Sequence, residues 1–202
     1  MKKLLITIAV YLLSMLPTWA FVVDSIPYNK IGINQVEVAY NSSQKMPQNL
    51  IIPEKVTYEG VTYKVTEIGY LALQYRKFSS IYIPNTVTLI NNNAFLECNV
   101  SQIVVPKSVK TIVSYAFTYC KATSYIIGES VETIGDGAFN TGLTSLSLPA
   151  SLKKVGIKCF RSDNLTLVSC AAVVPPILAD TTAFCFESTS KTMVDTLLVP
   201  AE

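Results

Sequence analysis

Apolar residues along the chain recur with a period of about 22 residues. The common pattern is I-x-I-P-x-x-V-x-x-I-x-x-x-A-F-x-x-C, and its separate positions stay in register through four or five copies. The Ala-Phe dipeptide marks the spacing at Ala94-Phe95, Ala116-Phe117 and Ala138-Phe139. Self-similarity of this kind predicts a stacked repeat architecture.

Each copy of the pattern predicts two short strands and one turn of helix. The I-x-I triplet, as at residues 81–83, alternates with the period of two expected for a strand with one buried face. Proline ends this strand because it has no main-chain N–H to donate. The V-x-x-I segment predicts the second strand, and Ala-Phe predicts a short helical turn whose Phe points into the core.

A single copy is too small to fold alone. Its roughly six apolar side chains contribute about 1.5–3 kcal/mol each when buried, whereas ordering about 22 residues costs about 1–2 kcal/mol each in backbone entropy. Stacking joins the strands of successive copies in parallel around a continuous core. We therefore predict a right-handed, parallel-β-rich solenoid of about five to six coils with a short helix in each coil.

A few positions break the pattern. Gly128 stands where other copies have the strand-ending Pro, and Cys159 stands in place of the Ala. The final Cys of the pattern is present at Cys98 and Cys120. Residues 169–176 lose the register, so we expect the last coil to be irregular or incomplete.

The first 20 residues have the layout of a secretory signal peptide. Lys2 and Lys3 precede an apolar stretch at residues 4–16, and small residues occupy the −3 and −1 positions before the expected cleavage site after Ala20. A bilayer needs about 20 apolar residues, so we expect contact with a membrane only during export. We predict a signal peptide at 1–20, an N-terminal β cap at 21–64 and the repeats at 65–202.

The repeat resembles the BspA-type leucine-rich repeats of surface proteins from host-associated bacteria. The resemblance covers about residues 50–200, and the segments 21–28, 36–40 and 52–58 resemble the β cap of such proteins. It implies a leucine-rich-repeat solenoid whose cap covers the strand edges of the first coil. It also implies adhesion to host proteins or to other bacteria. Residues 197–202 resemble the start of a repeat, so we expect a C-terminal cap or anchor to follow them.

Composition argues against catalysis and against nucleic-acid binding. The formal charge is 16 − 14 = +2, and without Lys2 and Lys3 it is 14 − 14 = 0, whereas a nucleic-acid site needs a basic face. The sequence has no histidine, which removes His-based acid–base and nucleophile pairs and most zinc and copper sites. We predict no enzymatic activity, no catalytic residues, no cofactor and no metal.

Carboxylates and cysteines do not form a recognisable site. Glu132 and Asp136 are the closest carboxylate pair in the repeats, but both are expected to face solvent rather than a cleft. Cys98 and Cys120 are expected to stack about 4.8 Å apart in neighbouring coils, near the range for a disulfide. Small buried hydrophobes are the favoured interpretation, and a disulfide stays open. The cysteines are Cys98, Cys120, Cys159, Cys170 and Cys185.

The middle residue of each I-x-I triplet is expected to face solvent. These candidate partner-binding residues are Tyr82, Val104, Ile126 and Ser147, with Ile51 and Leu198 in the flanking coils. An exposed apolar row is typical of a protein-binding face, while β-propensity or a covering layer is the alternative. A second aromatic set near the turns, expected to be partly buried with solvated hydroxyls, contains Tyr70, Tyr75, Tyr115 and Tyr119.

These observations predict a secreted or cell-surface protein that presents one face of a solenoid to an extracellular protein of the host matrix or of a microbial surface. The first alternative is a passive scaffold or spacer at the cell envelope. The second is a carbohydrate-binding module, which clustered surface aromatics over paired carboxylates would favour.

Overall fold

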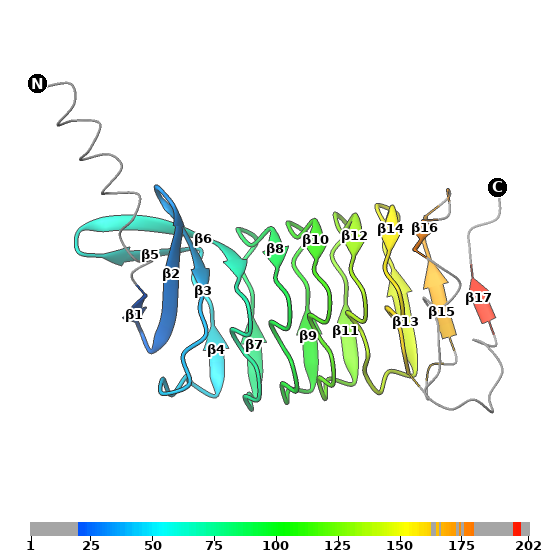
Figure 1. The fold of residues 1–202 in the computed structure, drawn as a ribbon, viewed down its shortest axis with the longest axis horizontal. Helices are drawn as coiled ribbons and strands as arrows, with labels where there is room; N and C mark the ends of the chain where they lie inside the picture. The colour runs from blue at the N-terminus through cyan, green and yellow to red at the C-terminus, as the bar shows by residue number, and fades with distance from the viewer. Residues whose placement is uncertain are drawn as a thin grey trace, which may run out of the picture.

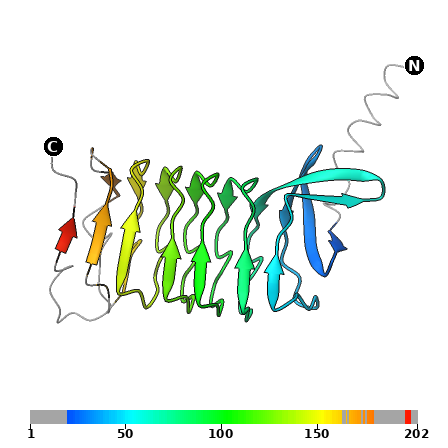
Figure 2. The ribbon, with the colours of Figure 1, turned by 180° about the vertical axis from the view of Figure 1, so that it is seen from behind.

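The computed structural model of the chain describes residues 20–162, 165, 167–172, 174, 176–179 and 196–198. Most of the predicted signal peptide lies outside the described residues, as do Cys185 and much of the last predicted coil. The described chain winds into coils that stack side by side along one axis, with strands aligned from coil to coil (Figures 1 and 2). This arrangement confirms the predicted parallel-β solenoid.

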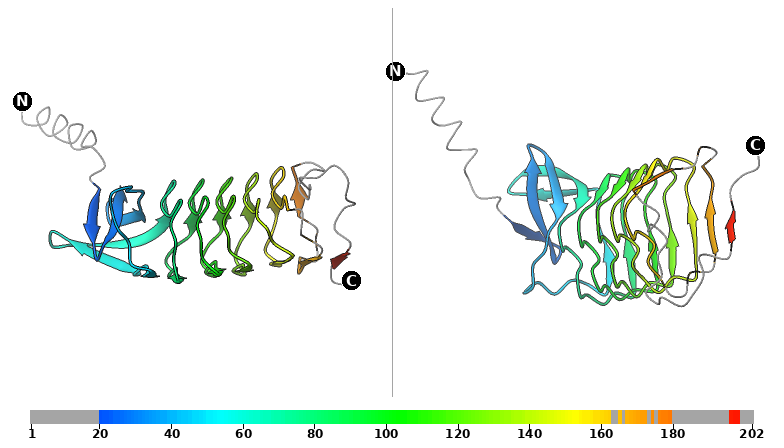
Figure 3. Two further views of the ribbon diagram at one scale, coloured as in Figure 1. Left: turned by 90° about the horizontal axis from the view of Figure 1, so that it is seen from below. Right: turned by 45° about the vertical axis from the view of Figure 1, so that its right-hand side comes forward.

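Antiparallel strands form the N-terminal end of the stack (Figure 3). They are β1 (Phe21–Val23), β2 (Ile26–Gly32), β3 (Gln35–Val38), β5 (Lys55–Tyr58) and β6 (Val61–Ile68). β1 pairs with β2, β2 with β3 and β5 with β6, all antiparallel, while β3 and β6 pair in parallel and start the solenoid sheet. Glu59 and Gly60 both have positive φ, as a two-residue hairpin turn requires.

Each later coil contributes one strand to each of two faces. The V-x-x-I strands are β8 (Leu89–Ile90), β10 (Thr111–Ile112), β12 (Thr133–Ile134), β14 (Lys154–Val155) and β16 (Ile177–Leu178). The I-x-I strands and their equivalents are β4 (Asn49–Ile51), β7 (Ser80–Tyr82), β9 (Gln102–Val104), β11 (Ser124–Ile126), β13 (Ser145–Leu148), β15 (Leu167–Cys170) and β17 (Thr196–Leu198). We call the second set the strand face.

The two faces differ in continuity. The V-x-x-I strands continue the sheet of β3 and β6 without a break as far as β16. The strand face is divided into three parallel groups, β4 with β7, β9 with β11, and β13 with β15 and β17. Successive coils on the strand face are therefore not equivalent, although their sequences follow one pattern.

The predicted short helix in each coil is wrong, because the described residues contain no helix. The Ala-Phe segments form consecutive turns instead. The N–H groups of Phe95 and Glu97 donate to the carbonyls of Ala116 and Thr118 in the next coil, at 2.8 and 3.0 Å. Asn93, with a φ of 54°, and Glu97, with a φ of 51°, also interrupt right-handed helical geometry. One turn of helix offers few internal hydrogen bonds, and bonds between coils replace them.

Identical positions stack in the core as the repeat predicts. The rings of Phe95, Phe117 and Phe139 are fully buried, with 5.0 Å between successive ring centroids. Phe160 continues the row at 5.9 Å from Phe139. This phenylalanine ladder runs along the axis of the solenoid and joins each coil to the next.

Two carboxylates lie side by side where β3 pairs with β6. Glu37 is the register partner of Glu67, and its carboxylate accepts a hydrogen bond from Nδ2 of Asn29 at 2.9 Å. Partial burial, together with the charge of Glu37, raises the pKa of Glu67 above its ordinary value. The ionised form of Glu67 is therefore less favourable in the folded protein than in the unfolded chain.

Replacing Glu67 with glutamine is expected to stabilise the protein at neutral pH. The pKa of Glu67 is higher in the folded protein than in the unfolded chain, so above the folded-state pKa the ionised carboxylate destabilises the fold. This cost decreases as the pH falls through the folded-state pKa and disappears below the unfolded-state pKa. The urea midpoint of Glu67→Gln should therefore exceed the wild-type midpoint at pH 7 and approach it in acid. Glu54→Gln, at an exposed position, is the control. An equal gain at both pH values would contradict this explanation.

Candidate binding surface on the strand face

The predicted outward residues lie on the solvent side of the strand face. Tyr82, Val104 and Ile126 are between 44% and 53% exposed, and Ser147 is also exposed. Ile51 is the register partner of Tyr82, and Val104 is the register partner of Ile126. We call Ile51, Tyr82, Val104, Ile126 and Ser147 together the apolar row, after its four apolar members. Its part in binding a partner stays a prediction.

A row of polar residues, which was not predicted from the sequence, runs beside the apolar row. It contains Asn49, Ser80, Gln102, Ser124 and Ser145, two residues before each member of the apolar row. Neighbouring side chains hydrogen-bond across the strands, from Ser80 Oγ to Asn49 Oδ1 at 3.0 Å and from Gln102 Nε2 to Ser124 Oγ at 3.3 Å. The same period of two that places Tyr82 on the outer side of the strand also places these residues there. The polar row could therefore have been predicted from the alternation in the sequence.

The strand face opens between β11 and β13. Val105 N–H donates to the Ile126 carbonyl at 2.8 Å, so the main-chain groups of Ile126 face β9. Neighbouring residues of a strand direct their main-chain groups to opposite sides, which turns those of Tyr125 and Ile127 toward β13. Among the described residues no main-chain hydrogen bond joins β11 to β13. The facing edges of these two strands are therefore unpaired.

Gly128, two residues after β11, lies in close contact with the preceding coil. A Cβ atom at this position would overlap the carbonyl oxygen of Pro106 and would lie 2.6 Å from its carbonyl carbon and 2.8 Å from Cα of Lys107. Only glycine allows the end of β11 to lie so close to the preceding coil.

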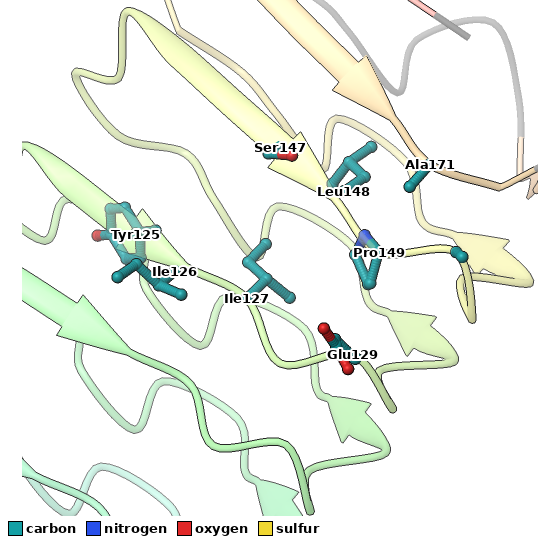
Figure 4. Close-up of a pocket in the computed structure, with 9 residues that line it drawn as sticks. Tyr125, Ile126, Ile127, Glu129, Ser147, Leu148, Pro149 and Ala171 are labelled. Atoms are coloured by element: carbon teal, nitrogen blue, oxygen red, sulfur yellow. The ribbon is translucent and has the colours of Figure 1, made fainter. Parts of the chain in front are cut away.

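A hollow of about 580 Å³ occupies the opening. It is lined by residues 125–127, Glu129, 147–150 and Ala171, which come from three coils (Figure 4). Ile127 is only half-buried there, whereas its equivalents Val105 and Leu148 are buried. The hollow lies beside Ile126 and Ser147, so it extends the apolar row into a concave site.

The second aromatic set is more exposed than predicted. All four side chains are exposed, and they are Tyr70, Tyr75, Tyr115 and Tyr119. The ring of Tyr115 covers Gly137, since a Cβ at Gly137 would lie 2.7 Å from two ring atoms. Tyr75, Tyr115 and Tyr119 also have positive φ. The turns between coils hold these residues in a left-handed conformation and direct their rings away from the core.

The other reactive groups have structural partners. Glu132 forms an ion pair with Lys153 Nζ at 2.8 Å, which lowers the pKa of Glu132, and Asp136 Oδ1 accepts a hydrogen bond from Ile157 N–H at 2.7 Å. The four described cysteines are buried free thiols, which matches the favoured interpretation. A hydrogen bond with the neighbouring Cys98 lowers the pKa of Cys120. The described residues contain no group of three His, Cys, Asp or Glu side chains that could hold a metal.

No helix in the described part of the chain is long and apolar enough to cross a membrane. Residues 66–192 match the BspA type leucine rich repeat region in six copies. No curated protein matches the chain.

Several solved structures are similar to the chain. The pneumococcal vaccine antigen PcpA has 25% identity and a TM-score of 0.49, with 79% of this chain and 40% of that chain covered. A leucine-rich repeat protein from Bacteroides capillosus has 19% identity and a TM-score of 0.48, with 90% and 99% covered. A leucine rich cell surface protein from Faecalibacterium prausnitzii has 20% identity and a TM-score of 0.47, with 84% and 58% covered. The chain thus spans 40% of the length of the pneumococcal antigen.

Proposed function

Because the chain belongs to the BspA-type leucine-rich repeat family, we propose that it is an exported surface protein that binds an extracellular protein through its strand face. The observation that carries this proposal is the apolar row on the strand face, bordered by the hydrogen-bonded polar row. An apolar centre with polar groups beside it is the usual composition of a protein interface. Tyr82 is the aromatic residue of the row and therefore its expected anchor.

The fold supports binding by a preformed surface. The strands of each group are fixed by main-chain hydrogen bonds to their neighbours, so the outward side chains are held in place before a partner arrives. A preorganised surface loses less conformational entropy on binding than a flexible one. A partner lying along the solenoid axis would contact several coils at once and gain a small contribution from each.

Export is supported by the sequence of residues 1–20. Ala20 is exposed and lies directly before β1, which begins with the buried Phe21. Cleavage after Ala20 would leave the antiparallel N-terminal strands intact. We propose binding rather than catalysis because the sequence has no histidine and because the closest carboxylates of the repeats have structural partners.

The test is binding of the exported mature protein to an array of host matrix proteins, microbial surface proteins and glycans. The triple variant Tyr82→Ser/Val104→Ser/Ile126→Ser should bind a protein hit at least about tenfold more weakly, which corresponds to about 1.4 kcal/mol. All three side chains are exposed, so the variant should fold normally.

A matched control changes three exposed tyrosines on the turns instead of the strand face. Tyr70→Ser/Tyr75→Ser/Tyr119→Ser should retain the protein hit. Loss of the hit only in this control would move the site to the turns. A glycan hit lost in the control would support the carbohydrate-binding alternative, and no hit from folded protein would support the scaffold alternative.

A further inference from the structure

The hollow between β11 and β13 has one charged residue in its lining, Glu129. The carboxylate of Glu129 is exposed and has no ion pair within the described part of the chain. Lys107 occupies the equivalent position in the preceding coil, and no ion pair joins it to Glu129. The hollow therefore presents a negative charge without a cation of its own to balance it.

The unpaired strand edge adds main-chain hydrogen-bonding groups beside this charge. The main-chain carbonyl and N–H groups of Tyr125 and Ile127 both face the opening, since those of Ile126 are directed to β9. The hydroxyl of Ser147, which accepts a hydrogen bond from Ser169 Oγ at 3.1 Å, lies at the border. The carboxylate of Glu129 only accepts hydrogen bonds when ionised and is the one charged group of the lining, so its part of the hollow suits a positively charged donor.

Apolar side chains form the rest of the lining. Ile126 and Ile127 come from one coil, and Leu148 and Pro149 come from the next (Figure 4). In Figure 4 the carboxylate of Glu129 lies at the same end of the hollow as Ile127 and Pro149. A ligand that fits must therefore combine an apolar stem with a positively charged, donor-rich end.

Arginine meets these requirements better than lysine. Its guanidinium carries five N–H donors in a plane and is weakly hydrated, whereas the lysine ammonium has three donors and is strongly hydrated. Its methylene stem packs on apolar surface while the charged end reaches polar groups. We propose that this hollow receives an arginine side chain of the extracellular protein partner, with the guanidinium at Glu129 and the stem between Ile127 and Pro149. This inference rests on the proposed function of the strand face.

The experiment is an NMR titration of the mature protein, labelled on its isoleucine and leucine methyl groups, with N-acetyl-arginine amide. N-acetyl-citrulline amide is the comparison ligand, because it has nearly the same shape without the charge. The arginine amide should shift the methyl signals of Ile126, Ile127 and Leu148 in a saturable way, and its affinity should be at least about tenfold higher than that of the citrulline amide. Equal shifts with both amides, or none with either, would overturn the proposal.

Two variants test the role of the charge. Glu129→Gln should weaken arginine amide binding at least about tenfold, and Glu97→Gln, an exposed carboxylate on the turns, should leave it unchanged. Unchanged binding in Glu129→Gln would overturn the proposal. If the arginine amide fails while the apolar-row variant still loses its protein partner, this inference is wrong and the proposed function stands.

Discussion

Replacing Phe117 with alanine is expected to lower the free energy of unfolding by about 3–5 kcal/mol. The ring is fully buried and lies 5.0 Å from the ring centroids of both Phe95 and Phe139. It also meets the ring of Tyr125 edge-on at 5.4 Å. Truncation therefore removes three aromatic contacts and leaves a cavity in the centre of the solenoid, where the coils above and below cannot move together to fill it.

The shape of the unfolding transition should change as well as its midpoint. Each coil contacts its neighbours, so stability is close to a sum of coil terms and interface terms. A cavity at Phe117 weakens two interfaces at once, and the two halves of the stack should begin to unfold separately. Urea denaturation followed by circular dichroism should show a lower midpoint and a broader or two-step transition.

Two control variants show how much of the stability loss in Phe117→Ala comes from the missing buried ring. Phe117→Leu retains most of the apolar volume and should cost less than the alanine variant. Tyr119→Ala removes an exposed aromatic residue two positions away and should cost little through lost burial. A loss below about 1 kcal/mol in Phe117→Ala would mean that the phenylalanine ladder does not couple the coils.

The stacking of coils could be predicted from the sequence because it depends on buried side chains. Positions such as Ile112 and Phe117 repeat every 22 residues, and burial requires them to lie above one another. The turns at the Ala-Phe segments could not be predicted in the same way. Local sequence favours a helical turn there, but the hydrogen bond from Phe95 N–H goes to Ala116 in the next coil. Such a bond becomes available only after stacking.

The binding surface was predictable in part. The period of two identified Tyr82 and Ile126 as outward residues, and it could have identified the polar row containing Gln102. The hollow could not be found in this way, because it results from the separation of two main chains. The sequence alone shows that Gly128 replaces the proline of the pattern, but its close contact with Pro106 appears only in the folded structure.

Replacing Gly128 with alanine is expected to destabilise the protein by about 1–3 kcal/mol. The new methyl group would meet the main chain of Pro106 and Lys107, which cannot rotate away as a flexible side chain could. The end of β11 would have to move from the preceding coil toward β13. Gly128→Pro, which restores the residue of the repeat pattern, should also destabilise, because proline carries the same Cβ atom.

The matched control for this prediction is Gly142→Ala. A Cβ at Gly142 meets no atom within 4 Å, so its effect on the unfolding free energy should stay within about 0.5 kcal/mol. Urea denaturation measures both variants, and the methyl signal of Ile127 reports whether the hollow narrows when β11 moves. If Gly128→Ala is as stable as Gly142→Ala and leaves that signal unchanged, the opening between β11 and β13 does not depend on the contact with Pro106. If it is less stable and the signal shifts, one missing Cβ atom determines both the separation of β11 from β13 and the shape of the hollow between them.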